Sequence, residues 1–290
     1  GHEVVGVDNL LIGQASNLAN ARTRREFSFV AGDVGDPATW AGIGGVDQVF
    51  HLACPASPTD FTTMPVEILR ASSIGTLQVA EFALEHGARM VLASTSEVYG
   101  EPEMHPQPEG YRGNVSTTGT RACYHEGKRF SEAVVSSFTR SRGLDAGIAR
   151  IFNTYGPRMR LNDGRVVANF VVQALCGQPL SVQGSGRQTR SFCYVEDQVR
   201  GLVALMGSGR NGPFNIGNDE EYSVLELAHM ILELTGSTST IEHLPLPQDD
   251  PSQRRPDLTA AREQLGWTPT IPLRAGLATV VDHFRAITNA

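Results

Sequence analysis

A chain of 290 residues is long enough for a sizeable core, in one large domain or in two coupled ones. Its 40% hydrophobic and 19% charged residues are ordinary for a globular enzyme. The net charge of −7 argues against a nucleic-acid partner, and no apolar run reaches the roughly 20 residues of a membrane span. The four cysteines lack the paired spacing of a disulfide framework or a zinc site, which predicts a cytoplasmic protein without a bound metal.

The first predicted strand, at residues 3–8, ends in an acid, Asp8. An acid at the end of the second strand of a dinucleotide-binding fold commonly accepts hydrogen bonds from the ribose hydroxyls. The glycine-rich turn that accompanies such an acid should stand roughly 20 residues earlier, which would be before Gly1. We therefore expect the first strand, the glycine-rich turn and most of the first helix to be absent from this sequence; the alternative is a fold that never had them.

Two further strands are predicted at residues 27–32 and 47–53. Asp33 follows the first of them and could accept from an adenine amino group, or could equally cap a helix. The loop after the second strand should line a ligand crevice, because loops at the carboxyl ends of the strands do so in doubly wound sheets. Residues 66–85 form an almost wholly apolar helix, which predicts burial in the core or against another subunit.

A strand at residues 89–93 runs into a hydroxyl-rich segment, in which Ser94, Thr95 and Ser96 precede Glu97. Three hydroxyls and a carboxylate at the carboxyl end of a strand can form a chemical site. The alternative is an ordinary turn, because serine and threonine also favour turns.

Tyr124 and Lys128 stand four residues apart on the next predicted helix, so both point to one face. Lys128 is the only lysine among 24 basic residues, although a lysine on a helix is ordinarily a solvated surface charge. A tyrosine has an unperturbed pKa of about 10, and a nearby ammonium would lower that pKa and let Tyr124 act as a base. With Thr95 to hold a substrate hydroxyl, the pattern predicts hydride transfer to a nicotinamide cofactor.

After a strand at residues 145–151 the alternation of strands and helices loosens. The glycine-rich segment 184–190 carries two arginines that suit a phosphate, or it is an exposed loop. We predict an α/β fold, with a Rossmann-type doubly wound parallel sheet in residues 1–152 and a smaller nucleotide-sugar-binding α/β domain in residues 153–290. We expect part of 190–215 to return to the first domain. Further helices are predicted at 195–207, 223–236, 258–265 and 273–288.

Several short motifs resemble those of the extended short-chain dehydrogenases/reductases, the group of NAD-dependent nucleotide-sugar epimerases, dehydratases and decarboxylases. The resemblance covers nearly the whole chain. Its motifs stand at residues 7–9, 51–53, 74–76, 124–128, 150–157 and 265–269. Within the group, the UDP-glucuronate decarboxylases are the most similar, on the stretches 94–100, 121–129, 162–167 and 184–190.

This resemblance implies a homodimer that binds NAD tightly and decarboxylates UDP-glucuronate to UDP-xylose through a transient 4-keto intermediate. A 4-epimerase or a 4,6-dehydratase is the alternative within the group, and the 4-epimerases usually carry a small residue at the position of Glu97. A non-catalytic nucleotide-binding protein is the alternative outside it, since a fold does not fix a function.

The resemblance also assigns roles to individual residues, with no metal ligand among them. The catalytic residues would be Thr95, Glu97, Tyr124, Lys128 and Arg254. The cofactor would be bound by Asp8, Asn9, Gly13, Asp33, Val34, Leu52, Ala53, Tyr124, Lys128, Thr154 and Arg165. The UDP-sugar would be bound by Ser96, Asn153, Asn169, Gln188, Arg190 and Arg254.

Overall fold

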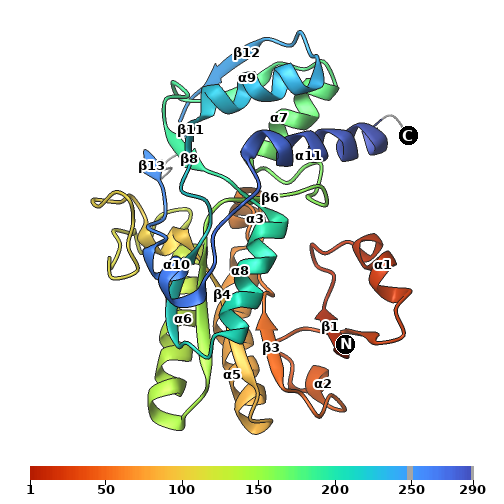
Figure 1. Ribbon diagram of the computed structural model, residues 1–290, viewed down its shortest axis with the longest axis vertical. Coiled ribbons are helices and arrows are strands. Elements are labelled where there is room, and N and C mark those ends of the chain that lie inside the picture. Colours follow the sequence, from red (N-terminus) through yellow and green to blue (C-terminus); the bar gives the residue numbers. More distant parts are fainter. Residues whose placement is uncertain (247–250, 289–290) are drawn as a thin grey trace.

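A computed structural model describes residues 1–246 and 251–288 of the chain (Figure 1). At its centre lies a four-stranded sheet in which every neighbouring pair of strands is parallel. In spatial order the strands are β10 (Gly212–Ile216), β5 (Ala146–Ile151), β4 (Arg89–Thr95) and β3 (Gln48–His51).

Alternate residues of strand β4 enter two different cores, as a sheet that is covered on both faces requires. Met90 and Leu92 pack against α5 and α6 on one face. Val91 packs against α8 and α10 on the other face. The predicted doubly wound α/β architecture is therefore confirmed. The four covering helices are α5 (Thr76–Glu85), α6 (Ala122–Arg142), α8 (Val195–Gly207) and α10 (Thr259–Leu265).

Strands β1 (Val4–Asp8) and β2 (Phe27–Ala31) form a separate parallel pair, joined through η1 (Ala15–Leu18) and α1 (Ala19–Arg22). Within residues 1–246 and 251–288, no strand is hydrogen-bonded between β1 and β3. In the Rossmann order 3-2-1-4, strand 1 of the fold lies between strands 2 and 4. The strand that we expect in that place from the sequence stays a prediction. Apolar side chains are exposed at Val4 and Val5 of β1, and at Phe50 of β3 and Leu52 directly after it.

The helical segments before the site differ in one respect from the sequence prediction. The helix predicted at 66–85 is α4 (Pro65–Arg70) continued into α5 through a π-helical segment, η2 (Ala71–Gly75). None of the helices in the described part of the chain is both long and apolar enough to cross a membrane. The other short helices of this half are α2 (Pro37–Trp40), α3 (Pro58–Thr63) and η3 (Ser96–Tyr99).

A second core, between three helices and several short strands, forms the upper part of Figure 1. Its helices are α7 (Val166–Leu175), α9 (Val224–Thr235) and α11 (Leu273–Thr288). Two of its sheets are parallel pairs: β6 (Thr154–Tyr155) with β9 (Cys193–Tyr194), and β7 (Leu180–Gln183) with β12 (Ile241–Leu244). The third sheet has the order β11 (Glu221–Ser223), β8 (Thr189–Ser191) and β13 (Gln253–Arg254).

Replacing Ile148 by alanine tests the core of the parallel sheet. Ile148 is 2% exposed, so the cavity should lower the free energy of unfolding by about 2–5 kcal/mol in urea denaturation. The matched change at Ile287, which is 44% exposed, should stay within about 0.5 kcal/mol of the wild type. Equal losses at both positions would contradict this assignment of the core.

Candidate active site

Thr95, Tyr124 and Lys128 meet where strand β4 ends against the first turns of helix α6. All three are buried, and the Thr95 and Tyr124 side chains are hydrogen-bonded to each other. Lys128 Nζ donates to the carbonyl oxygen of Ala93 at 2.9 Å. The ring of Phe61 stacks on Tyr124, with the centroids 4.9 Å apart. The structure thus brings together the hydroxyl, the phenol and the ammonium that the sequence predicted as one site.

Burial, rather than the ammonium, sets the acidity of the tyrosine. Burial raises the pKa of Tyr124, the nearby Cys54 adds to this effect, and the hydrogen bond with Thr95 opposes it. In the protein alone the pKa of Tyr124 is therefore raised, and the lowering predicted from the ammonium together with a positive nicotinamide ring stays a prediction. The protonated phenol is the form that this environment favours.

Behind Lys128 lies a buried histidine that is held neutral. Burial and the charge of Lys128 lower the pKa of His51 to about 3. Its Nε2 lies 3.1 Å from Thr76 Oγ1, which in turn lies 3.0 Å from Ser131 Oγ. This chain of polar contacts fixes strand β3 against helices α5 and α6.

Glu97 lies at the centre of a largely buried cluster. Its carboxylate is surrounded by the side chains of Arg121, His125 and Arg254. Its Oε1 accepts from Arg121 Nη2 at 2.9 Å and from Arg254 Nη1, and its Oε2 lies 2.6 Å from His125 Nε2. Burial alone would raise the pKa of Glu97. The charges of Arg254 and Arg121 and the hydrogen bond with His125 outweigh burial and hold this pKa well below its usual range. Glu97 is therefore a carboxylate at neutral pH.

Strand β13 delivers Arg254 to this cluster. Arg254 pairs in parallel register with Arg190 of β8, so the two guanidinium groups belong to neighbouring positions of one sheet. Arg190 Nη2 donates to the carbonyl oxygen of Pro251 at 2.6 Å. Arg254, which binds Glu97, thus has a second arginine at the neighbouring position of the sheet, and the predicted binding of a charged sugar nucleotide by the two stays a prediction.

The loop after η3 holds the Arg254 segment in place through its backbone. Gln107 N donates to the Arg255 carbonyl oxygen at 2.9 Å, and Arg255 N donates to Gln107 Oε1 at 2.8 Å. Ser252 N donates to Glu101 Oε2 at 2.9 Å. Because these bonds join segments about 150 positions apart in the sequence, the two halves of the chain meet at the site.

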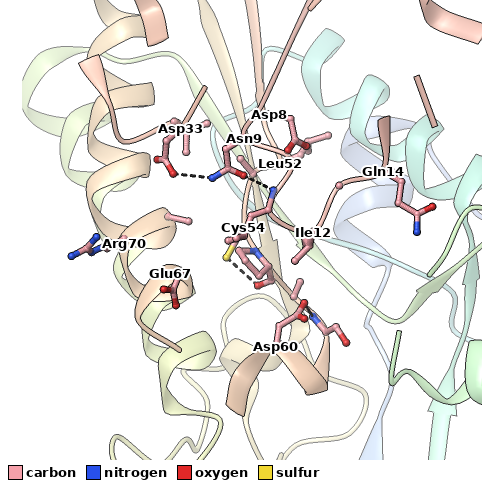
Figure 2. Close-up of a pocket in the computed structure, with 18 of the residues that line it drawn as sticks. Asp8, Asn9, Ile12, Gln14, Asp33, Leu52, Cys54, Asp60, Glu67 and Arg70 are labelled. Carbon is pink, nitrogen blue, oxygen red and sulfur yellow. Dashed lines mark hydrogen bonds between the residues drawn. The ribbon is translucent and has the colours of Figure 1, made fainter. Parts of the chain in front are cut away.

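A pocket of about 660 Å³ opens at the carboxyl ends of β1, β2 and β3 (Figure 2). Asn9 Nδ2 donates to Asp33 Oδ2 at 2.9 Å, which joins the ends of β1 and β2. A Cβ on Gly13 would lie 3.1 Å from Asp8 Oδ2, so glycine keeps the space beside this carboxylate open. The residues of the predicted cofactor site that line the pocket are Asp8, Asn9, Gly13, Asp33, Val34, Leu52, Ala53 and Arg165.

The structure does not bring every predicted residue to this pocket. Tyr124, Lys128 and Thr154 lie outside its lining, and Thr154 Oγ1 donates to the carbonyl oxygen of Phe152 at 2.9 Å. Gln188 Nε2 donates to the carbonyl oxygen of Gln183, the last residue of β7, at 2.7 Å. The assigned roles of these residues stay predictions, as do those of Ser96, Asn153 and Asn169.

Two features of the site were not predicted from the sequence. Arg121 and His125 were noticed only as part of a motif, yet both bind Glu97; their spacing of four residues places them on one face at the start of α6. Asp60 of α3 accepts from Arg160 Nη2 at 2.9 and 3.1 Å across the pocket. No sequence pattern predicts this long-range ion pair. In the described ranges, no group of three or more His, Cys, Asp or Glu side chains is arranged to hold a metal ion.

Comparison with known proteins gives consistent matches over most of the chain. Residues 1–217 match the NAD dependent epimerase/dehydratase family. Over 98% of its length the chain is 47% identical to UDP-glucuronic acid decarboxylase 1 of Xenopus tropicalis, of which it spans 67%. Over 98% it is 48% identical to UDP-glucuronic acid decarboxylase 5 of Arabidopsis thaliana, of which it spans 82%. The structure of DesIV, a dTDP-glucose 4,6-dehydratase from Streptomyces venezuelae with NAD and TYD bound, matches with a TM-score of 0.91 at 26% identity, covering 99% of this chain and 88% of that one.

Replacing Glu97 by glutamine tests the charge cluster. The change removes the charged partner of the buried Arg254 and one partner of the partly buried Arg121, so the free energy of unfolding at neutral pH should fall by about 3–5 kcal/mol. Because the pKa of Glu97 is lower in the folded than in the unfolded protein, its stabilising effect is complete above the ordinary value of 4.5 and is lost as the pH falls through the lowered value. The difference between variant and wild type should therefore shrink in acid.

Urea denaturation at several pH values measures this difference. The matched control is Glu85→Gln, at an exposed glutamate of α5, which should change stability by no more than about 0.5 kcal/mol at any pH. A Glu97→Gln deficit that stays constant down to strong acid would contradict the assigned ionisation.

Proposed function

Because this chain belongs to the NAD dependent epimerase/dehydratase family, we propose that it decarboxylates UDP-glucuronate to UDP-xylose with tightly bound NAD. One observation carries the proposal: the Glu97–Arg254 ion pair is buried in the same site as the hydrogen-bonded Thr95 and Tyr124. With NAD as the hydride acceptor and donor, a tyrosine and a threonine are enough protein side chains to oxidise and reduce an alcohol. The buried ion pair adds the charged groups that the loss of a carboxylate and the later protonation of a carbon need.

The pocket at Asp8 fits the adenosine part of NAD. Its volume of about 660 Å³ is in the usual range for a ligand site. Asp8 can accept from ribose hydroxyls in the space that Gly13 leaves open, and Asp33 lies beside it at the end of β2. When bound, NAD supplies the acceptor and then the donor of a hydride.

Tyr124 is the group that takes the proton from the sugar's 4-hydroxyl. Thr95, hydrogen-bonded to Tyr124, holds the same hydroxyl in place. Since burial raises the pKa of Tyr124, its phenolate is a stronger base for this proton than that of an exposed tyrosine would be. Lys128, one helical turn further along α6, holds the ribose next to the reacting ring, as its family position implies.

Oxidation at the 4-position turns the substrate into a β-keto acid. The bond between the ring and the carboxylate carbon then breaks, its electron pair forms an enolate with the new ketone, and carbon dioxide leaves. Arg190 and Arg254 suit the diphosphate and the sugar, because guanidinium groups bind such oxygens in a fixed geometry. Glu97 takes part in the protonation of the ring carbon. Reduction of the ketone then gives the pentose.

We propose further that the protein is a homodimer in the cytoplasm. Large apolar side chains are exposed on neighbouring helices of one face, at Leu69 of α4, Ile74 of η2 and Phe130 of α6. Burying such side chains against a second copy removes them from water, as C2 dimers commonly do. All four cysteines are free thiols, which supports a reducing compartment.

Incubation of the purified protein with UDP-glucuronate and NAD tests the proposed activity. We expect carbon dioxide and UDP-xylose in equal amounts, with no net formation of reduced cofactor. The Tyr124→Phe variant should slow turnover by about 10²-fold or more, because its ring lacks the proton-transferring oxygen. Formation of an epimerised acid without release of gas would contradict decarboxylation and favour a 4-epimerase.

Sedimentation velocity of Phe130→Asp tests the proposed dimer. The charge on a 47%-exposed position should dissociate the dimer while leaving the fold intact. The matched control is Val203→Asp on α8, at a position 58% exposed on the opposite side of the sheet, which should leave the dimer intact. A Phe130→Asp protein that sediments like the wild type would contradict an interface at α6.

A further inference from the structure

His125 lies on the side of helix α6 that covers η3, away from the cofactor pocket. Four residues later on the same side, Arg129 Nη1 donates to the carbonyl oxygen of Val98 in η3 at 3.2 Å. His125 is 4% exposed, and its Nε2 lies 2.6 Å from Glu97 Oε2. The helix that carries Tyr124 thus also carries, at the next position, a buried partner for Glu97.

The two oxygens of Glu97 have different kinds of partner. Oε1 accepts from the guanidinium groups of Arg121 and Arg254. Oε2 has His125 as its hydrogen-bond partner. The contact with His125 therefore fixes the rotation of the carboxylate and distinguishes one oxygen from the other.

Among these partners, His125 has the side chain that commonly transfers protons in enzymes near neutral pH, an imidazole. Guanidinium groups stay protonated in proteins, so Arg121 and Arg254 can neutralise Glu97 but cannot hand it a proton. An imidazole exchanges protons readily in this range. The same arginines keep Glu97 ionised, so Glu97 on its own holds no proton for the ring carbon.

We propose that His125 acts as a positioning and proton-supplying partner of Glu97 during decarboxylation, a role that rests on the proposed function. The N–H bond at Nε2 breaks as an O–H bond forms on the carboxylate of Glu97. That O–H bond then breaks as a C–H bond forms at the enolate carbon left by carbon dioxide. The imidazole regains a proton from the solvent, which thereby supplies the one proton that the exchange of the carboxylate for hydrogen consumes, so Glu97 and His125 return to their starting states.

Single-turnover measurements on His125→Gln test this role. Glutamine keeps an N–H donor for Glu97 but cannot give up a proton, so positioning is preserved and proton supply is lost. We expect UDP-xylose formation to slow by about 10²-fold while KM changes little. Because the ketone cannot be reduced until the carbon is protonated, the absorbance of reduced nicotinamide should rise at the wild-type rate and persist. The matched control is His86→Gln, which should behave as the wild type. His86 is a partly buried histidine that is hydrogen-bonded to the carbonyl oxygen of Phe82.

Two outcomes would overturn the proposal. One is a His125→Gln enzyme that forms UDP-xylose at the wild-type rate; the other is one in which the appearance of reduced nicotinamide slows as much as product formation does. The His125→Asn variant, with a smaller side chain, is read in the same way if the glutamine variant does not fold. Failure of the proposed function can be told apart from failure of the role of His125, because the wild type itself would then release no carbon dioxide from UDP-glucuronate.

Discussion

The buried carboxylate of Glu97 is the interaction on which the arrangement of this site depends. A carboxylate in a desolvated position is costly unless charged and hydrogen-bonding partners surround it. Arg121, His125 and Arg254 provide those partners, and in doing so they join η3, the start of α6 and strand β13. Removing the carboxylate would take away the group to which all three side chains are bonded, so the chemistry and the packing of the site are set by the same contacts.

The parallel sheet explains why these segments meet. Strand β4 ends at Thr95, and η3 follows at once, so the hydroxyl and the carboxylate leave the sheet at one edge. Helix α6 returns along the sheet and begins at that same edge, with Tyr124 and His125 in its first turn. The C-terminal half contributes Arg254 through backbone pairing of β13 with β8. Strand β4 with η3 thus supplies Thr95 and Glu97, helix α6 supplies Tyr124 and Lys128, and strand β13 supplies Arg254.

Much of this could be predicted from the sequence. The alternation of apolar strands and helices predicted the doubly wound sheet, and the Tyr124–Lys128 spacing predicted one helix face, because both depend on local periodicity. The Arg254–Glu97 contact joins residues 157 positions apart, and only a resemblance to a known family pointed to both. The rise in the Tyr124 pKa of the protein alone was not predicted, since burial by Phe61 and its neighbours is a property of tertiary packing. The Asp60–Arg160 pair was missed for the same reason.

In the mechanism that we propose, the Glu97 cluster acts after a temporary oxidation, on the loss of the carboxylate and the protonation of the ring carbon. A single-turnover reaction of Glu97→Gln with UDP-glucuronate tests it most directly, by measuring reduced nicotinamide and UDP-xylose together. We expect reduced nicotinamide to form at close to the wild-type rate and to persist, while UDP-xylose forms about 10²-fold more slowly. UDP-xylose formation at the wild-type rate, or an oxidation step slowed as much as product formation, would contradict it.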